Sequence, residues 1–402
     1  MTGPPRALFR PKARTSTRIF LGRNMTAESA DYFLLLGTTI FLVVLGLIMV
    51  FSSSSVDSGR TNAGFFGIFG RQGISALVGV PLMLVVSRLP AKFFRRIAIP
   101  ALFAAGAFQL LVFTPLGEVV GGNRNWISIG GVGVQPSEAV KLALVLWLGM
   151  ILSLKKDLLN DWKHALIPVI PVAGGAILLV LLGDDLGTVM VMAGIVIGAL
   201  FFSGVRLRVI GLLALSGAAI AVAAAVTNPN RLRRVVTFLG DECTDYANSC
   251  WQPLHGMWAL ANGGFFGVGL GNSKAKWSWL PAANNDYIFA IIGEEMGFLG
   301  AFVVLAMFVL LAVVFVRIIR SSNDMFVRVV TGSVLAWTIG QAFLNVGVVL
   351  RLVPVLGVPL PLISAGGSAL ITSLVAIGIV LSFARERATI PAQFHLDSSA
   401  SR

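Results

Sequence analysis

A chain of 402 residues that is 56% hydrophobic and only 12% charged falls outside the range of soluble globular domains, in which about 25% of residues are charged. A net charge of +13 would suit nucleic-acid binding in a soluble protein, but here the basic residues fall in short clusters between apolar runs. That pattern is a signal of membrane topology and not a nucleic-acid footprint. We therefore expect an all-α, polytopic membrane protein that binds no nucleic acid.

The apolar runs predict about ten transmembrane helices, because a spanning helix needs roughly 20 mostly apolar residues. In chain order the predicted spans are 32–52, 71–87, 97–114, 137–154, 165–182, 186–203, 209–226, 297–316, 329–349 and 364–384. The fifth and sixth spans are the hardest to separate, since Asp184 and Asp185 lie between them with almost no loop. This pair could instead be one kinked or re-entrant element.

The spans divide the chain into a basic, disordered cytoplasmic tail at 1–31, a ten-helix membrane domain at 32–387 and a cytoplasmic C-terminal tail at 388–402. A long outer loop falls at about 227–287. With the N-terminus inside, 21 of the 31 Lys and Arg residues lie on the inner side, so both termini are predicted to be cytoplasmic. No cleavable signal peptide, P-loop, dinucleotide fingerprint or metal-ligand cluster is visible in the sequence, which argues against ATP-driven transport by this chain alone.

Ionisable groups near membrane depth are costly and are therefore candidates for function. The first are Arg124, Glu138 and Lys141, at the approach to the fourth span. Pro136 suits a first helical turn, and Glu138 opposes the positive end of the helix dipole and can pair with Lys141. Two interpretations stay open: a capped helix with one ion pair, or cations at Arg124 and Lys141 that hold an anionic lipid phosphate on the outer side.

Carboxylates also flank two other apolar runs. Asp185 could be the N-cap of the sixth span, with Asp184 as a solvated neighbour, or a site residue. Asp286 could likewise be an N-cap, but partial burial at the outer interface would raise its pKa and suit it to general-base work. Glu294 and Glu295 lie inside the following apolar helix, where capping does not explain them.

The fourth polar patch is the segment 345–369, in which three prolines and paired glycines break the helix at the outer face. Irregular backbone at membrane depth is tolerated only where it is buried in protein or lines a wet cavity. All four patches fall on the outer side, beside a long loop with three arginines, Arg231, Arg233 and Arg234. Together they predict an outward-facing polar cavity for a large amphiphile with a phosphate head and a lipid tail.

At these positions the chain resembles the SEDS (shape, elongation, division and sporulation) family. The run Asn345–Ala369 matches a long family signature of spaced Asn, Pro and Gly that ends in Ser-x-Gly-Gly-Ser. Shorter matches are the Gln135–Lys141 box, Asp185–Thr188, Gly263–Gly271 and Asp286–Glu295. The resemblance covers nearly everything from Tyr32 to Arg387.

The resemblance implies a peptidoglycan glycosyltransferase that polymerises lipid II into glycan strands, with inversion and with undecaprenyl diphosphate as the leaving group. Asp286 falls on the family's essential aspartate, and we expect it to be the general base that takes the proton of the acceptor sugar 4-hydroxyl. Arg124, Lys141 and one of Arg231 or Arg233 are expected to neutralise the diphosphate. The other expected substrate-binding residues are Glu138, Asp185, Glu295, Ser364, Gly366 and Gly367.

The resemblance also implies partners and a location. Family members work with a class B penicillin-binding protein, a transpeptidase, and with other membrane proteins of the division machinery. No metal ligand is assigned, although a divalent cation, Mg or Mn, could assist at the diphosphate. Residues 49–56 and the long basic tail favour a septal over an elongation role, and so enrichment at the septum of the inner membrane.

Two functions other than a polymerase stay open. A lipid II flippase would need a polar path to the cytoplasmic side, and a structural scaffold would make Asp286 dispensable.

Cys243 and Cys250 are additions to the common family pattern in the outer loop. On an oxidising outer face we expect them to form a disulfide, with two free thiols as the alternative.

Overall fold

The structure is a computed structural model that describes residues 30–60, 67–120, 122–130, 132–159, 161–227, 229–239, 250–277 and 279–388. The two predicted tails, at 1–31 and 388–402, lie almost wholly outside these residues.

Within the described residues, nine helices are long and apolar enough to cross a membrane, and a tenth, α6, is apolar but shorter. They are α1 (Ala30–Arg60), α2 (Gly67–Val86), α3 (Ala91–Leu110), α4 (Pro136–Leu154), α5 (Trp162–Leu181), α6 (Leu186–Phe202), α7 (Leu207–Thr227), α10 (Ile288–Arg320), α11 (Met325–Val349) and α12 (Gly367–Ala388). Each corresponds to one predicted span, so the helical membrane architecture is confirmed. The idea of one kinked element at 165–203 is wrong, because α5 and α6 are separate helices joined by a turn in which Asp184 has φ 65°.

The helices divide into a buried centre and a rim. In the most apolar window of α4 and of α11, 72% of residues are buried, against 22% in α5 and 11% in α7. α11 packs on α4, α6 and α10, and α12 packs on α2. Side chains that face lipid need no protein contacts, so α5 and α7 form part of the lipid-facing rim around α4 and α11.

α10 is interrupted at Gly297, whose φ of 69° and ψ of −168° are not helical. A Cβ at this position would lie 2.3 Å from the backbone N of Gly267, so only glycine fits the close approach. The eighth predicted span, 297–316, therefore begins at a true break. The preceding turns, Ile288–Met296, form a separate and largely buried segment.

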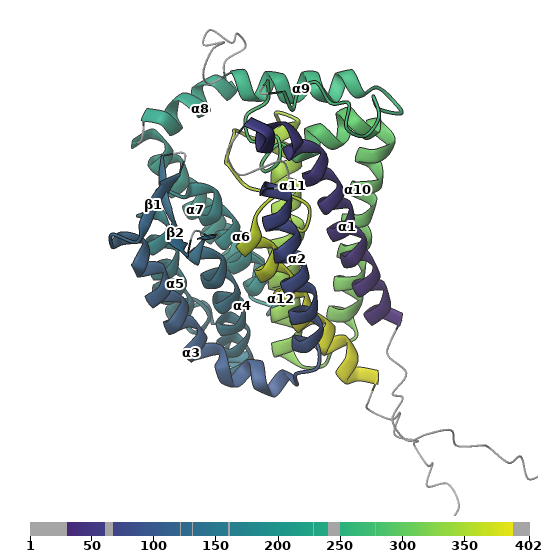
Figure 1. Ribbon diagram of the computed structural model, residues 1–402. Helices are drawn as coiled ribbons and strands as arrows, with labels where there is room; N and C mark the ends of the chain where they lie inside the picture. Colours follow the sequence, from purple (N-terminus) through teal and green to yellow (C-terminus); the bar gives the residue numbers. More distant parts are fainter. Residues whose placement is uncertain are drawn as a thin grey trace, which may run out of the picture.

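Two further helices, α8 (Pro229–Leu239) and α9 (Trp251–Gly263), cross one end of the bundle (Figure 1). α1 begins and α12 ends at the opposite end (Figure 1). This arrangement fits the expected outer loop and the expected shared side of the termini, although the orientation in a membrane stays a prediction.

The one departure from a purely helical fold among the described residues is a three-stranded antiparallel sheet between α3 and α4. Its strands are β1 (Gly117–Val120), β2 (Asn123–Ile129) and β3 (Val132–Val134), in that order. The backbone N–H of Arg124 in β2 donates to the Gly183 carbonyl, 2.9 Å away, and so ties the sheet to the turn between α5 and α6. A search for long apolar runs passes over strands this short.

Candidate active site

Asp286 lies in a turn at 281–287 that leads into α10, and the predicted irregular segment holds this turn in place. The Nδ2 of Asn345 donates to the carbonyls of Asp286 and Val358, both at 2.7 Å. The Oγ of Ser364 donates to the carbonyl of Asn285 at 2.7 Å. The break between α11 and α12 therefore positions the backbone of Asp286.

The carboxylate of Asp286 is unusual because its buried Oδ1 has no hydrogen-bond partner. Three neighbouring atoms are in the same condition: the Oδ1 of Asn285, the Oη of Tyr287 and the Oδ1 of Asn345. Buried polar atoms are nearly always hydrogen-bonded, and each exception calls for an explanation. Four such atoms on one turn and on α11 make this place the candidate polar site.

Burial raises the pKa of Asp286 from its ordinary 3.8 to about 6; Arg234 lowers it and Asp185 raises it further. Burial also raises the pKa of the Tyr287 hydroxyl, with Asp286 acting in the same direction and with Arg234 and Arg351 acting against it. A carboxylate with a pKa near 6 is still ionised at neutral pH and is a stronger base than an exposed aspartate. The electrostatics therefore suit Asp286 to proton abstraction.

Asp185 is the N-cap of α6. Its Oδ1 accepts from the backbone N–H of Thr188 at 3.0 Å, and its Oδ2 accepts from Asn125 at 2.8 Å and Gln135 at 3.0 Å. The capping interpretation of Asp185 describes this geometry. The same carboxylate joins β2 and the start of α4 to α6, while its substrate-binding role stays a prediction.

The predicted ion pair between Glu138 and Lys141 is present and buried, with a distance of 2.8 Å between Oε1 and Nζ. Lys141 also lies 4.7 Å from the ring centroid of Trp337, and Thr372 donates to Glu138 at 3.1 Å. The pair thus fastens α4 to α11 and α12. Arg124 donates from Nη2 to the Thr114 carbonyl at 2.9 Å. The expected roles of Arg124 and Lys141 toward a phosphate remain predictions.

Glu295 does not face the polar site of Asp286. Its two oxygens accept from the Oγ of Ser52 at 2.7 Å, and its Oε1 also accepts from the Ser273 backbone N–H at 3.3 Å. Lys276 completes the cluster with an ion pair at 3.4 Å. These bonds join α1 and the loop after α9 to α10, which favours a structural role over the expected substrate contact.

Ser364, Gly366 and Gly367 position the site from the side of α12. Gln72 of α2 bridges two of them, since its Nε2 donates to the Ser364 carbonyl and its Oε1 accepts from the Gly366 N–H, both at 3.0 Å. A Cβ on Gly367 would lie 2.7 Å from the Oγ of Ser75, so α2 and α12 approach closely there. Their expected contact with substrate stays a prediction.

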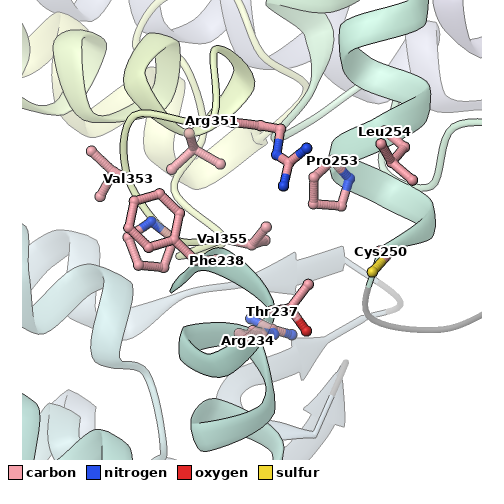
Figure 2. A pocket seen from close by; sticks show the side chains of 11 residues that line it. Arg234, Thr237, Phe238, Cys250, Pro253, Leu254, Arg351, Val353 and Val355 are labelled. Atoms are coloured by element: carbon pink, nitrogen blue, oxygen red, sulfur yellow. The ribbon is translucent and has the colours of Figure 1, made fainter. Parts of the chain in front are cut away.

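The three outer arginines lie in α8, and the expected contact of Arg231 or Arg233 with the diphosphate stays a prediction. The side chain of Arg231 lies outside the described residues, and Arg233 is exposed. Arg234 is exposed as well, and it lines a pocket with Arg351, a residue that the sequence did not single out (Figure 2). Arg234, Thr237 and Phe238 share one face of α8, and this helical spacing was a signal that could have identified Arg234.

Cys250 lines the same pocket and is disulfide-bonded. The sequence contains one other cysteine, Cys243, which lies outside the described residues.

With this geometry established, comparison with known proteins identifies the family. A family model described as "Cell cycle protein", which covers FtsW, RodA and SpoVE, matches residues 32–389. The chain belongs to this family.

Two curated relatives of the family illustrate the similarity. The chain is 39% identical over 391 residues to the probable peptidoglycan glycosyltransferase FtsW of Mycobacterium tuberculosis. The aligned region covers 96% of this chain and 73% of the relative. It is 33% identical over 364 residues to stage V sporulation protein E of Bacillus subtilis. This aligned region covers 90% of this chain and 98% of the relative.

Solved structures show the same fold. A chain from work on the structural coordination of polymerization and crosslinking by a peptidoglycan synthase complex superposes with a TM-score of 0.73 at 25% identity, over 90% of this chain and 99% of that one. The rod shape determining protein RodA of Thermus thermophilus gives a TM-score of 0.66 at 24% identity, over 91% of this chain and 99% of that one.

No group of three or more His, Cys, Asp and Glu side chains that could hold a metal ion occurs in the part of the chain that the structure describes. A divalent cation at the diphosphate therefore stays a prediction. Among the described residues, the Oδ1 of Asp286 is buried without a hydrogen-bond partner, and Arg234 lowers the pKa of its carboxyl group.

Proposed function

We propose that this chain is a peptidoglycan glycosyltransferase that polymerises lipid II into glycan strands at the division septum, with Asp286 as its general base. The observation that carries the proposal is the carboxylate of the half-buried Asp286, whose buried Oδ1 has no partner among the described residues and whose pKa is raised to about 6. Membership of the family and its similarity to probable peptidoglycan glycosyltransferases of the FtsW type support the reaction class.

The proposed reaction is a single displacement at the anomeric carbon of the donor sugar. The acceptor 4-hydroxyl gives its proton to Asp286 while its oxygen forms a bond to that carbon. The bond from the same carbon to the diphosphate oxygen breaks, and undecaprenyl diphosphate leaves with the electron pair and with inversion. A displacement of this kind needs one base and cationic stabilisation of the leaving group, and it needs no covalent enzyme intermediate.

The rigid setting of Asp286 supports this role. Its backbone carbonyl accepts from the Nδ2 of Asn345 at 2.7 Å, and the preceding Asn285 carbonyl accepts from Ser364 at 2.7 Å. A base that is fixed before the substrate binds loses little freedom in the transition state.

The proposal extends to surroundings and partners. We place the chain in the inner membrane with both termini in the cytoplasm, so that α8, α9 and Asp286 face the outer side. A class B penicillin-binding protein would then cross-link the strands as they form. The peptidoglycan synthase complex among the structural neighbours supports such an assembly.

Polymerisation of purified lipid II by the detergent-solubilised protein with its cognate penicillin-binding protein tests the proposal. We compare the wild type with Asp286→Asn and with a matched control, Asp161→Asn, which changes the N-cap of α5 far from the site. Strands from the wild type and the control but not from Asp286→Asn are expected. Undiminished polymerisation by Asp286→Asn would overturn the assignment, and lipid II transfer in vesicles without any polymerisation would favour the flippase.

A further inference from the structure

We propose that Arg234 and Arg351 form a two-arginine site for the diphosphate group of the substrate and product lipids. The proposal rests on the proposed function, in which a diphosphate leaves next to Asp286. Arg231 or Arg233 was the contribution expected from the outer loop; Arg234 and Arg351 come from α8 and from the end of α11.

The pocket is formed by segments far apart in the sequence. Arg234 and Thr237 enter it from α8, Arg351 and Val355 from the segment after α11, and Pro253 from α9. Figure 2 shows the guanidinium of Arg351 reaching into the space between these elements, with Arg234 and Thr237 on the opposite side.

The backbone at Arg351 is a second, independent observation. Its φ is 56°, in the left-handed region, directly after the C-cap of α11 at Leu350. Glycine is the residue that usually ends a helix in this conformation, since it has no Cβ to clash. A non-glycine residue held there is strained, and such strain is commonly retained where the side chain has a function.

Within the described residues, neither guanidinium forms an ion pair with a carboxylate. Both arginines nevertheless act electrostatically on the turn at 281–287. Arg234 lowers the pKa of Asp286, and both arginines lower the pKa of Tyr287. Two positive charges that face one pocket repel each other until an anion binds between them. The planar fork of donors on each guanidinium matches phosphate oxygens bidentately, and a diphosphate offers one phosphate to each arginine.

The central test variant is Arg351→Gly. It removes the guanidinium while allowing the same left-handed turn, so the midpoint of thermal unfolding should stay level or rise. Arg351→Lys keeps the positive charge without the fork, and Arg234→Gln removes the second cation. Lys274→Gln is the matched control, since it removes an exposed cation of the loop after α9 that does not line the pocket.

The probes are undecaprenyl diphosphate in detergent and inorganic pyrophosphate, and the readout is their dissociation constant by thermophoresis of the full-length protein. All variants are measured in the Asp286→Asn background as well, so binding is read without turnover. We expect Arg351→Gly and Arg234→Gln each to weaken undecaprenyl diphosphate binding about tenfold or more, because charge-assisted hydrogen bonds are lost. Arg351→Lys should lie between them and the parent, and Lys274→Gln should bind as the parent does.

The outcomes separate the two claims and the two sources of the ligand. Equal affinity in Arg351→Gly, Arg234→Gln and the parent would overturn the two-arginine site even if Asp286 proved to be the base. If Asp286→Asn stayed active while the arginine variants bound undecaprenyl diphosphate more weakly, the assignment of Asp286 as the base would be overturned and the two-arginine site would stand. Competition by inorganic pyrophosphate shows that the diphosphate alone is recognised, whereas arginine-dependent binding of only the lipid form assigns the site to the lipid headgroup.

Discussion

Two acidic sites in one stretch of the chain are built in opposite ways. Asp286 has a buried carboxylate oxygen without a partner, whereas every carboxylate oxygen of Glu294 and Glu295 accepts a hydrogen bond from Ser52, Ser273, Asn262 or the backbone after them. Burying a charge is costly unless it is paired and hydrogen-bonded. The glutamates meet that requirement within the protein, whereas the Oδ1 of Asp286 does not meet it among the described residues.

The difference shows that hydrogen-bond partners can separate structural carboxylates from reactive ones. Both sites are acidic, and both precede or lie within the same apolar helix. The glutamates are almost fully buried, and Asp286 is half-buried with its Oδ1 covered, so their place in the sequence does not distinguish them. Their hydrogen-bond partners distinguish them. The glutamate side chains connect α1, α9 and α10 through hydrogen bonds, whereas the Asp286 side chain connects no elements among the described residues. The experiments below test this contrast from its largest expected effect to its smallest.

Asp286→Asn should have the largest effect, and only on activity. Loss of a general base typically lowers turnover by about 100-fold or more. Stability should stay level or rise, because a neutral amide of the same shape replaces a buried and unpaired charge. Polymerisation rate and thermal unfolding are measured on the same preparation; a variant that unfolds at much lower temperature than the wild type would mean that the carboxylate has a structural partner after all.

Glu295→Gln should instead act on stability. It leaves Lys276, which is buried and pairs with Glu295 at 3.4 Å, without its counter-charge. Breaking one partner of a buried pair costs about 3–5 kcal/mol of unfolding free energy. Unfolding in denaturant measures this, and the double variant Glu295→Gln/Lys276→Met should lose less than Glu295→Gln alone.

A different outcome for Glu295→Gln would change the contrast. Normal stability combined with lost polymerisation would return Glu295 to the substrate site, where the sequence interpretation had placed it.

Activity should depend on pH through the ionisation of Asp286. Its pKa is raised to about 6, and only the ionised form accepts a proton, so kcat/KM should fall about tenfold per pH unit below that value. The stability effect has the opposite sign. Because the folded pKa exceeds the ordinary 3.8, protonation favours the native state, and the stability advantage of Asp286→Asn at pH 8 should shrink as the pH falls through 6 toward 4. A flat profile down to pH 5 would show that another group is the base.

The sequence predicted the spans because they depend on local features. Runs of about 20 apolar residues identify α1 to α12 with the exception of α8 and α9. A carboxylate before an apolar helix made Asp286 a candidate, but its role as base came from the family resemblance and stays a prediction. The Glu138–Lys141 pair was predictable for the same reason, since its partners lie on one helical face.

What the sequence missed depends on contacts between distant segments. Ser52 and Glu295 are 243 residues apart, and no pattern in either segment indicates that they bond. Arg351 enters the pocket because its backbone turns into the left-handed region, which a one-letter sequence does not reveal for an arginine. The substrate-binding expectation for Glu295 failed to anticipate its protein partners, because an acidic residue in an apolar helix looks the same whether it serves a ligand or a neighbouring helix.

The smallest expected effect tests whether the glutamate cluster is as fully paired as its geometry indicates. Ser52→Ala removes one donor to Glu295 but leaves the Ser273 N–H and Lys276 in place. A single hydrogen bond to a charged group contributes about 1.5–3 kcal/mol, and the remaining partners should hold the loss near the lower end of that range. Ser216→Ala on the exposed face of α7, where the hydroxyl bonds only the Leu213 carbonyl within its own helix, is the matched control and should be nearly neutral. Equal losses in the two variants would mean that Glu295 does not depend on α1, and the contrast with Asp286 would then rest on Lys276 and the loop after α9 alone.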